Sequence, residues 1–150
     1  MNNIKEYDLL SWADDKDIKK AINDEKIYYS DFVYKFSSFG LKQERIILLT
    51  ENNFYYMKNK TISNKILYKD ILGITISKSS EEFIIHINNQ ETDYYFTSKN
   101  RNIALMQMSA LYNYSTNKVL KICEVVQKKY ETIYNYEKRE KKEYRKYKNG

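Results

Sequence analysis

Few residues of this 150-residue chain carry side chains that usually catalyse reactions or bind metals. His86 is its one histidine and lies between Ile85 and Ile87 in an apolar run. An imidazole can act as a general base, a pH-sensitive group or a metal ligand. A metal site needs several ligands, and the sequence shows no obvious partner beside His86. We therefore predict no metal site, and a structural role for His86 in a strand that pairs across a sheet.

The remaining reactive side chains also favour structural roles. Cys123 stands among aliphatic residues, which predicts a buried thiol rather than a reactive one. Glu81 and Glu82 are neighbours where a loop enters an apolar segment, and carboxylates in such a position are usually solvated. The three glycines are too widely spaced to form a phosphate-binding loop. These observations predict a binding protein that is not an enzyme and uses no cofactor.

The composition excludes several classes of protein. With 42% apolar and 15% aromatic residues, the chain has enough apolar material for one hydrophobic core. A single cysteine cannot form an internal disulfide, which excludes the disulfide framework of small secreted domains. No apolar run approaches the roughly 18 residues of a membrane span, and the first residues lack the apolar stretch of a signal peptide. We therefore expect a cytoplasmic protein.

Positive charge is concentrated toward the C-terminus. The chain has 26 Lys and Arg against 20 Asp and Glu, a formal net charge of +6. Residues 1–31 have five basic and eight acidic side chains, whereas residues 127–150 have nine basic and four acidic ones. With the patterns described below, this distribution predicts an N-terminal helical extension (1–26), a central domain (27–115) and a basic helical tail (116–150).

Between residues 27 and 97 the pattern is that of short β-strands. Apolar and aromatic residues recur at every second position, and turn-forming residues interrupt them at close intervals. Seven strands are predicted, at Ile27–Phe36, Gln43–Thr50, Phe54–Lys58, Lys65–Tyr68, Ile71–Ser77, Glu82–Ile87 and Thr92–Thr97. Such a series predicts an antiparallel meander that forms a sandwich or a small barrel.

Helical patterns flank the predicted strands. The first 25 residues have apolar side chains at helical spacing, and Ser11 and Asp14-Asp15 could cap a break into two short helices. Another helix is predicted to begin after Asn100 or Asn102. Its expected buried stripe is Ile103, Met106, Ala110 and Tyr114, with Leu105, Met108 and Tyr112 beside it. From residue 118 on, the sequence favours a long basic helix, although residues 119–126 could instead form a strand.

Several segments of the middle of the chain follow a recognisable pattern. Asp31–Phe36 is a strand with a lysine near its end, and Gly40–Thr50 has lysine and arginine before an apolar run that ends in Leu-Thr. Ser80–Ile87 has an acidic pair, Phe, aliphatic residues and His, and Asp93–Phe96 follows it. In this order the segments resemble the tail homology 1 domain of class I myosins, over about residues 27–115.

This resemblance implies an α+β protein with a pleckstrin-homology-like fold. Such a fold is a seven-stranded antiparallel barrel or sandwich capped by a C-terminal helix, to which this chain adds an N-terminal helical segment and a long basic C-terminal helix. The resemblance also implies a module that binds anionic phospholipid at a membrane surface. The lipid-binding residues it implies are Lys35, Lys42, Arg45 and Lys65, and Phe39 at the loop tip could enter the headgroup region. Read as a whole protein, the chain would be a free-standing domain without a motor.

The basic tail favours a second kind of partner. Residues 128–148 mix basic residues with tyrosines, but interspersed glutamates and the lack of a recognised RNA-binding motif argue against nucleic acid. The alternative function is a structural adaptor in a cytoskeletal assembly of microtubules, an axoneme or actin, which would bind through the barrel and the tail. The expected location is therefore a peripheral membrane or the cytoskeleton. The partner-binding candidates are Lys138, Arg139, Lys141, Lys142, Arg145 and Lys146.

Overall fold

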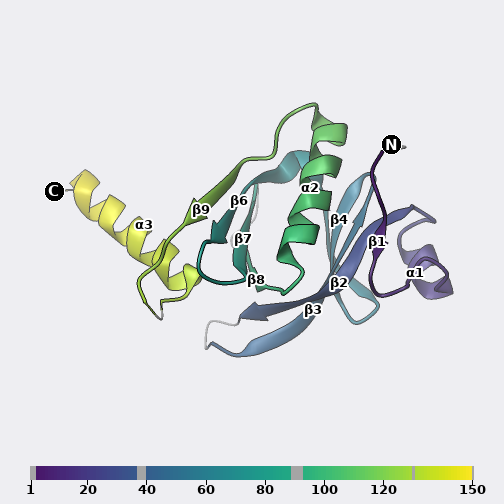
Figure 1. Ribbon diagram of the computed structural model, residues 1–150, viewed down its shortest axis with the longest axis horizontal. Helices are drawn as coiled ribbons and strands as arrows, with labels where there is room; N and C mark the ends of the chain where they lie inside the picture. Colours follow the sequence, from purple (N-terminus) through teal and green to yellow (C-terminus); the bar gives the residue numbers. More distant parts are fainter. Residues whose placement is uncertain (1–2, 37–39, 89–92, 130, 150) are drawn as a thin grey trace.

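The computed structural model describes residues 3–36, 40–88, 93–129 and 131–149, with side chains described as far as residue 141. Figure 1 shows a strongly bent sheet with α2 lying against it, and α1 and α3 toward opposite ends of the long axis. In chain order the elements are β1 (Tyr7–Asp8), α1 (Lys16–Ala21), β2 (Ile27–Phe36), β3 (Lys42–Thr50), β4 (Asn53–Lys58), β5 (Thr61–Leu67), the 3-10 turn η1 (Tyr68–Asp70), β6 (Ile71–Ser77), β7 (Glu82–Ile87), β8 (Tyr94–Thr97), α2 (Arg101–Thr116), β9 (Ile122–Val125) and α3 (Ile133–Asn149).

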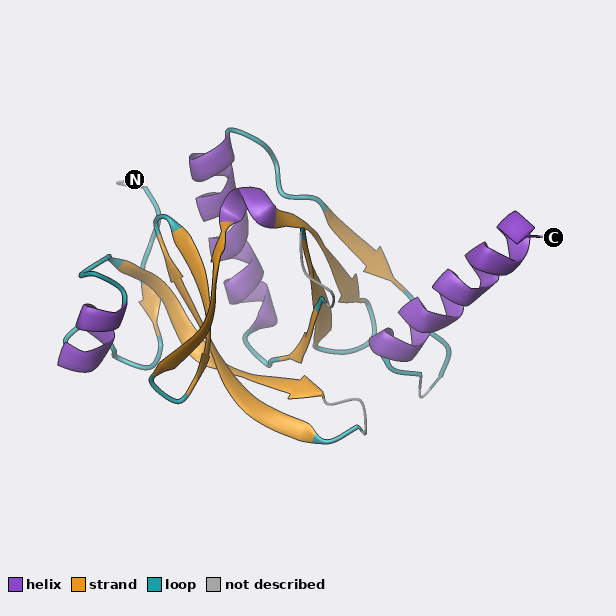
Figure 2. Cartoon of the chain, turned by 180° about the vertical axis from the view of Figure 1, so that it is seen from behind, coloured by secondary structure: helices purple, strands orange, loops and turns teal. Residues whose placement is uncertain are grey.

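All seven predicted strands are present as β2 to β8, and the pairs that they form with one another are antiparallel. The order across the sheet is β5-β4-β3-β2-β8-β7-β6-β9. Because β5 and β6 follow each other in the chain but lie far apart in this order, the sheet bends around a core (Figure 2). The predicted barrel or sandwich is therefore confirmed, with β5 beginning four residues earlier than expected.

Two further strands extend the sheet, and both pair in parallel. β9 pairs with β6, so residues 122–125 of the undecided segment form a strand rather than a helix. β1 pairs with β2, within a segment that we had predicted to be helical. That prediction was wrong because the Asp8 carboxylate accepts hydrogen bonds from the backbone N–H groups of Trp12 (3.1 Å) and Ala13 (2.8 Å). A side chain that bonds to the backbone in this way competes with helix formation.

The N-terminal helix that does form is short and covers the outer face of the sheet. α1 has six residues and is capped by Asp15, whose side chain accepts from the backbone N–H groups of Asp17 and Ile18, both at 3.0 Å. The cap at Asp14-Asp15 is therefore confirmed. Ile18 and Ile22 are fully buried. The cluster beneath the helix consists of Ile18, Ile22, Ile27, Ile46, Leu48, Tyr55 and Met57.

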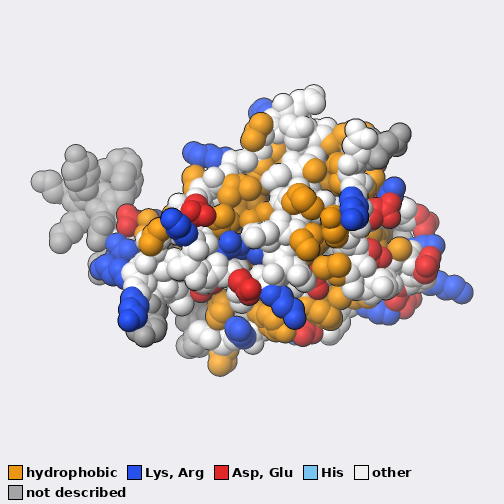
Figure 3. Space-filling view, viewed as in Figure 1, with side chains coloured by type: hydrophobic (Ala, Val, Ile, Leu, Met, Phe, Trp, Pro, Cys, Tyr) orange, Lys and Arg blue, Asp and Glu red, His pale blue; other side chains and the backbone are white. Residues whose placement is uncertain are grey.

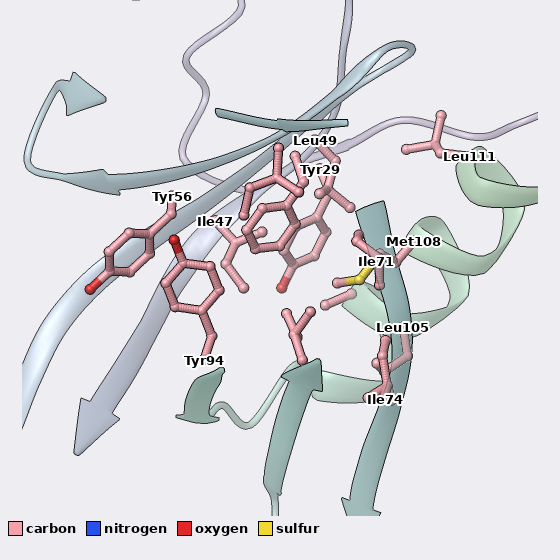
Figure 4. Packing of buried hydrophobic residues seen from close by; sticks show 14 of the residues in the cluster. Tyr29, Ile47, Leu49, Tyr56, Ile71, Ile74, Tyr94, Leu105, Met108 and Leu111 are labelled. Atoms are coloured by element: carbon pink, nitrogen blue, oxygen red, sulfur yellow. The ribbon is translucent and has the colours of Figure 1, made fainter. Parts of the chain in front are cut away.

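The main core lies on the inner face of the bent sheet, between the strands and α2 (Figure 4). α2 buries Ala104, Leu105, Met108 and Leu111, with Gln107 among them. The predicted stripe was wrong at two positions, because Met106 is 49% exposed and Tyr114 is 50% exposed.

The buried face of α2 was predicted incorrectly because it includes a polar residue, Gln107. Its side-chain amide donates to the carbonyl oxygens of Lys5 (2.5 Å) and Tyr28 (2.8 Å). A buried polar side chain is stable when its hydrogen bonds are satisfied, so α2 turns a glutamine toward the core. The contact also attaches α2 to the start of β2 and closes that end of the sheet.

The opposite end of the sheet holds two hairpin turns. The β2–β3 hairpin turns there, since Phe36 is opposite Lys42, and so does the β4–β5 hairpin, since Lys58 is opposite Thr61. We call this the open end and define it by these four residues.

Candidate functional site

Two of the predicted lipid-binding residues lie on the inner face of the sheet near the open end. Lys35 on β2 is opposite Gln43, and Arg45 on β3 is opposite Val33. Opposed residues of antiparallel strands point to the same face, and side chains alternate between faces along a strand. Because Val33 is fully buried in the main core, Lys35 and Arg45 point to the core side of the sheet. Both are half-buried.

A third cation, which the sequence analysis did not select, continues this arrangement. Ile46 on β3 is opposite Met57 on β4, and extending that register by one residue places Arg45 opposite Lys58. Lys58 is exposed. Lys35, Arg45 and Lys58 thus stand on three neighbouring strands of one face, and we call them the inner basic row. Since donors on one face can converge on the oxygens of one anion, this row is a candidate anion-binding surface.

Aromatic side chains line the core beside the inner basic row. The Lys35 Nζ lies 6.0 Å from the ring centroid of Tyr56, and the Tyr56 ring is 4.6 Å from that of Tyr94 (Figure 4). The Asn64 side-chain amide donates to the Tyr94 hydroxyl at 3.0 Å. The rings therefore restrict the conformations of the Lys35 side chain and keep its ammonium group at the edge of the core. Lys58 follows Tyr56 by two residues, and this spacing is the sequence signal that could have identified it.

The other predicted cations lie on the outer face. Lys42 is exposed, and its Nζ lies 5.3 Å from the ring centroid of Tyr34. Lys65 is exposed and opposite Tyr55, which packs beneath α1. The structure therefore brings Lys35 and Arg45 together on one face, and it does not place Lys42 or Lys65 with them.

The region around Lys42 is electrostatically mixed. A hollow of about 380 Å³ on the outer side is lined by Asp31, Phe32, Tyr34, Lys42, Glu81, Thr97, Ser98 and Lys99. Its two carboxylates oppose its two lysines, so it offers no net attraction for an anion. On the face shown in Figure 3, basic and acidic side chains are likewise interspersed. The inner basic row is therefore the better candidate for an anionic ligand.

The tip of the β2–β3 hairpin carries an exposed apolar side chain. Leu41 is 65% exposed. It follows Gly40, whose φ of +78° is a backbone conformation that side chains disfavour. Phe39, the predicted membrane-inserting residue, lies outside the described residues.

The partner-binding candidates of the tail whose side chains the structure describes, Lys138, Arg139 and Lys141, each contact a group of the tail itself. Arg139 donates to both carboxylate oxygens of Glu131 at 3.1 Å, and the Lys138 Nζ lies 4.6 Å from the ring centroid of Tyr134. The Lys141 Nζ is 3.9 Å from Glu137. These contacts offset part of the tail's positive charge. The side chains of Lys142, Arg145 and Lys146 lie outside the description, although their backbone belongs to α3 as predicted.

The beginning of α3 packs on the outer face of β7 and β8. Ile133 is fully buried against Ile84 and Tyr95. Phe36, the last residue of β2, packs against the same cluster, with its ring 5.1 Å from that of Tyr95. The turn end of the β2–β3 hairpin and the beginning of α3 therefore share one apolar cluster, and we call it the hairpin–tail cluster.

Glu82 also holds α3 in place, which corrects our expectation of a solvated carboxylate. Its Oε1 accepts from the Tyr95 hydroxyl at 2.7 Å, and its Oε2 accepts from the Ile133 backbone N–H at 3.0 Å. Burial, and then the hydrogen bond to Glu82, raise the pKa of Tyr95 above its ordinary value. The sequence pattern did not reveal this role because Ile133 is far from Glu82 in the chain.

Cys123 was predicted to be buried, and this prediction was wrong. Its thiol is exposed because β9 is an edge strand that pairs on one side with β6. His86 lies on β7 as predicted, opposite Gly73.

The architecture first defines a class of protein. A seven-stranded antiparallel meander, bent around a core and closed at one end by the helix that follows it, is the pleckstrin-homology-like fold. The family model described as "Unconventional myosin tail, actin- and lipid-binding" matches residues 6–150 of the chain. The chain therefore belongs to this myosin tail family. The match includes the N-terminal segment and the tail as well as the central strands.

Solved structures agree with the fold. The hSac2 domain of the human phosphoinositide phosphatase Sac2 has a TM-score of 0.57 and 12% identity, over 83% of this chain and 92% of that one. The C-terminal domain of an unknown protein from Leishmania infantum has a TM-score of 0.51 and 14% identity, over 63% of this chain and 91% of that one. The DH/PH fragment of PDZRHOGEF, solved with human RhoA, has a TM-score of 0.50 and 13% identity, over 67% of this chain and 32% of that one. At these identities the likeness concerns the fold.

Among curated proteins, no sequence matches the chain significantly. Within the described residues, no helix combines the length and the apolar composition that crossing a bilayer requires.

Proposed function

We propose that the chain is a peripheral binding module for anionic phospholipid, and that the inner basic row is the centre of its binding surface. The observation that carries this proposal is the placement of Lys35, Arg45 and Lys58 on neighbouring strands of one face at the open end. Membership of a family described as lipid-binding supports it. The protein would then work on the cytoplasmic side of a membrane.

The geometry suits a phosphate-bearing headgroup. Arg45 presents a planar fork of donors, whereas the two lysines present compact charges, and a phosphate accepts both kinds. Leu41 at the hairpin tip would enter the headgroup region while the row faces the phosphates. Lys42 and Lys65 lie on the other face, and their predicted roles remain proposals for a wider membrane contact.

Binding through the row alone would be weak. Each basic residue near an anionic membrane surface contributes about 1 kcal/mol, so three contribute about 3 kcal/mol. A second contact is needed for stable attachment. The tail is a suitable one because α3 starts at the hairpin–tail cluster, next to the hairpin.

The double variant Lys35→Ala/Arg45→Ala tests the proposal. Removing two charges is expected to lower the affinity for vesicles that contain phosphatidylserine or a phosphoinositide by about 30-fold, which corresponds to about 2 kcal/mol. The measurement is sedimentation with these vesicles and with vesicles of phosphatidylcholine alone. Binding should also weaken as salt is raised.

A matched control removes two charges elsewhere. Lys69 and Lys118 are exposed, and they belong to η1 and to the segment after α2, away from the hairpin. Lys69→Ala/Lys118→Ala should therefore change the affinity by less than threefold. Equal losses in the two double variants, or equal pelleting of the wild type with neutral vesicles, would contradict the proposal.

The second candidate function is attachment to actin. It is favoured by the family's description and by the basic composition of α3. Cosedimentation with actin filaments should be lost when residues 141–150 are deleted. This deletion keeps Ile133 and Glu137 in place, so the hairpin–tail cluster remains intact. Unchanged cosedimentation would exclude the end of the tail as the filament-binding segment.

A further inference from the structure

The fold places two carboxylates beside the one histidine of the chain. One comes from the segment before β8 and the other from α3. His86 is on β7, Asp93 immediately precedes β8, and Glu137 is on α3. All three are half-buried. One ligand atom from each lies within 4.8 Å of the others. Three segments thus bring one imidazole nitrogen and two carboxylates together.

The hydrogen bonds indicate which ring nitrogen is available. The His86 Nδ1 is 2.7 Å from the Asp93 Oδ2, and the Asp93 Oδ1 accepts from the Ile87 backbone N–H at 3.0 Å. An ionised carboxylate can only accept, so Nδ1 carries a proton, and Nε2 is the ring nitrogen that could bind an ion. The Thr75 Oγ1 lies 2.7 Å from Nε2, and a bound ion would replace this contact. A metal-binding histidine is oriented in this same way, with its other N–H on a carboxylate.

The distance between His86 and Glu137 fits two ligands of one metal ion. The His86 Nε2 is 3.6 Å from the Glu137 Oε1, which is too long for a hydrogen bond. Zinc binds imidazole nitrogen and carboxylate oxygen at about 2.0–2.2 Å in a tetrahedral arrangement, which separates neighbouring ligand atoms by roughly 3.4 Å. A small side-chain movement would therefore place both atoms on one ion.

There is room beside the ring for the remaining ligands. A hollow of about 400 Å³ is lined by Leu72, Gly73, Ile74, Thr75, His86, Asp93, Lys121 and Cys123. It gives an ion access to the imidazole, and it is large enough for water molecules to complete the coordination. Imidazole with carboxylate and water suits zinc and related divalent transition metals, whereas magnesium and calcium prefer oxygen ligands alone.

We propose that His86 and Glu137 bind a divalent transition-metal ion of the zinc class, with Asp93 orienting the imidazole. Because the two ligands come from β7 and α3, the ion links the tail helix to the sheet. The site lies beyond the hairpin–tail cluster along α3, since Glu137 follows Ile133 by one helical turn. This proposal does not depend on lipid binding.

Isothermal titration calorimetry of the untagged full chain with zinc chloride tests the proposal. We expect one saturable site, and at least a tenfold loss of affinity in His86→Gln and in Glu137→Gln. Glu140→Gln is the matched control, because Glu140 is an exposed carboxylate on the same helix and should leave the affinity unchanged. Asp93→Asn should lower the affinity by about 10-fold or more through loss of ring orientation.

A measurement on the wild type keeps the test valid if a variant fails to fold. The chain has one histidine, so its imidazole nitrogen resonances are unambiguous. Zinc should shift the Nε2 resonance and leave Nδ1 protonated. Absence of saturable binding, unchanged affinity in Glu137→Gln, or an Nε2 resonance that does not respond would each overturn the proposal.

Discussion

Replacing Ile133 with aspartate is expected to release α3 from the sheet. Ile133 is fully buried against Ile84 and Tyr95, and burying an isoleucine side chain contributes about 2 kcal/mol. Aspartate loses this contribution and would also bury a charge near Glu82. The ratio of docked to released helix should therefore fall by about 30-fold or more. A polar helix of this length is only marginally stable in isolation, so release should also unfold it.

Hydrogen exchange of the α3 amides in the full chain measures this effect. Protection of residues 133–141 should fall in Ile133→Asp, while protection of β3 and β4 stays as in the wild type. Asn135→Asp is the control, since Asn135 is exposed and the change adds the same charge within the same helical turn. If protection survives in Ile133→Asp, the hairpin–tail cluster is not what holds α3.

Glu25→Ala is expected to destabilise the whole domain by about 3 kcal/mol. The Glu25 carboxylate accepts from the hydroxyls of Tyr55 (2.5 Å) and Thr50 (2.9 Å) and from the side-chain amide of Asn53 (3.2 Å). Hydrogen bonds to a charged group contribute about 1.5–3 kcal/mol, and removing the acceptor leaves partly buried donors unpaired. In a chain of this size the midpoint of thermal unfolding should fall by about 6–12 °C.

Thermal and urea unfolding measure this loss, and Glu124→Ala is the control because Glu124 is exposed on the edge strand β9. Alkaline pH gives a second comparison. Burial, and then the hydrogen bond to Glu25, raise the pKa of Tyr55. Its contribution to stability is therefore present below about pH 10 and lost as pH rises further, because the folded state holds the phenol proton more tightly. This alkaline loss should be smaller in Glu25→Ala. Equal stability of the wild type and Glu25→Ala would contradict the assigned role.

The strands were predictable because their signal is local. Each of β2, β6 and β7 was predicted with its observed bounds, since alternation at every second position marks a strand with one buried face. β5 was predicted too short because residues 61–64, on an edge strand, contain one apolar residue, Ile62, among polar ones. The order of strands and the helix after them then led to the correct fold and family.

The segments that pair in parallel were not predictable in the same way. β1 has two residues, and it exists because β2 offers it a free edge. β9 is explained by its pairing with β6, from which it is separated by the whole of β7, β8 and α2. Short strands of this kind take their conformation from the neighbour they pair with, so their own sequence contains little of the signal.

The candidate site was partly predictable for a related reason. The family resemblance selected Lys35 and Arg45, and strand register places both on the inner face. The resemblance could not distinguish these two residues from Lys42 and Lys65, because the face of the sheet on which a side chain lies is known only once the core is known. It omitted Lys58, which becomes a member of the row through the pairing of β3 with β4.

The sequence by itself determined the series of strands, the helix that follows them, the Asp15 cap of α1, the basic tail and the family, because these depend on residue type and on spacing along the chain. Only the tertiary structure decided which charges share a face and which side chains meet from distant segments. His86 illustrates the difference, since no ligand partner stands beside it in sequence, whereas the docking of α3 brings Glu137 to within 3.6 Å of its ring. Contacts of this kind depend on how whole elements pack against one another. Packing depends on the shapes of the surfaces that meet, and these shapes cannot be read from the order of residues along the chain.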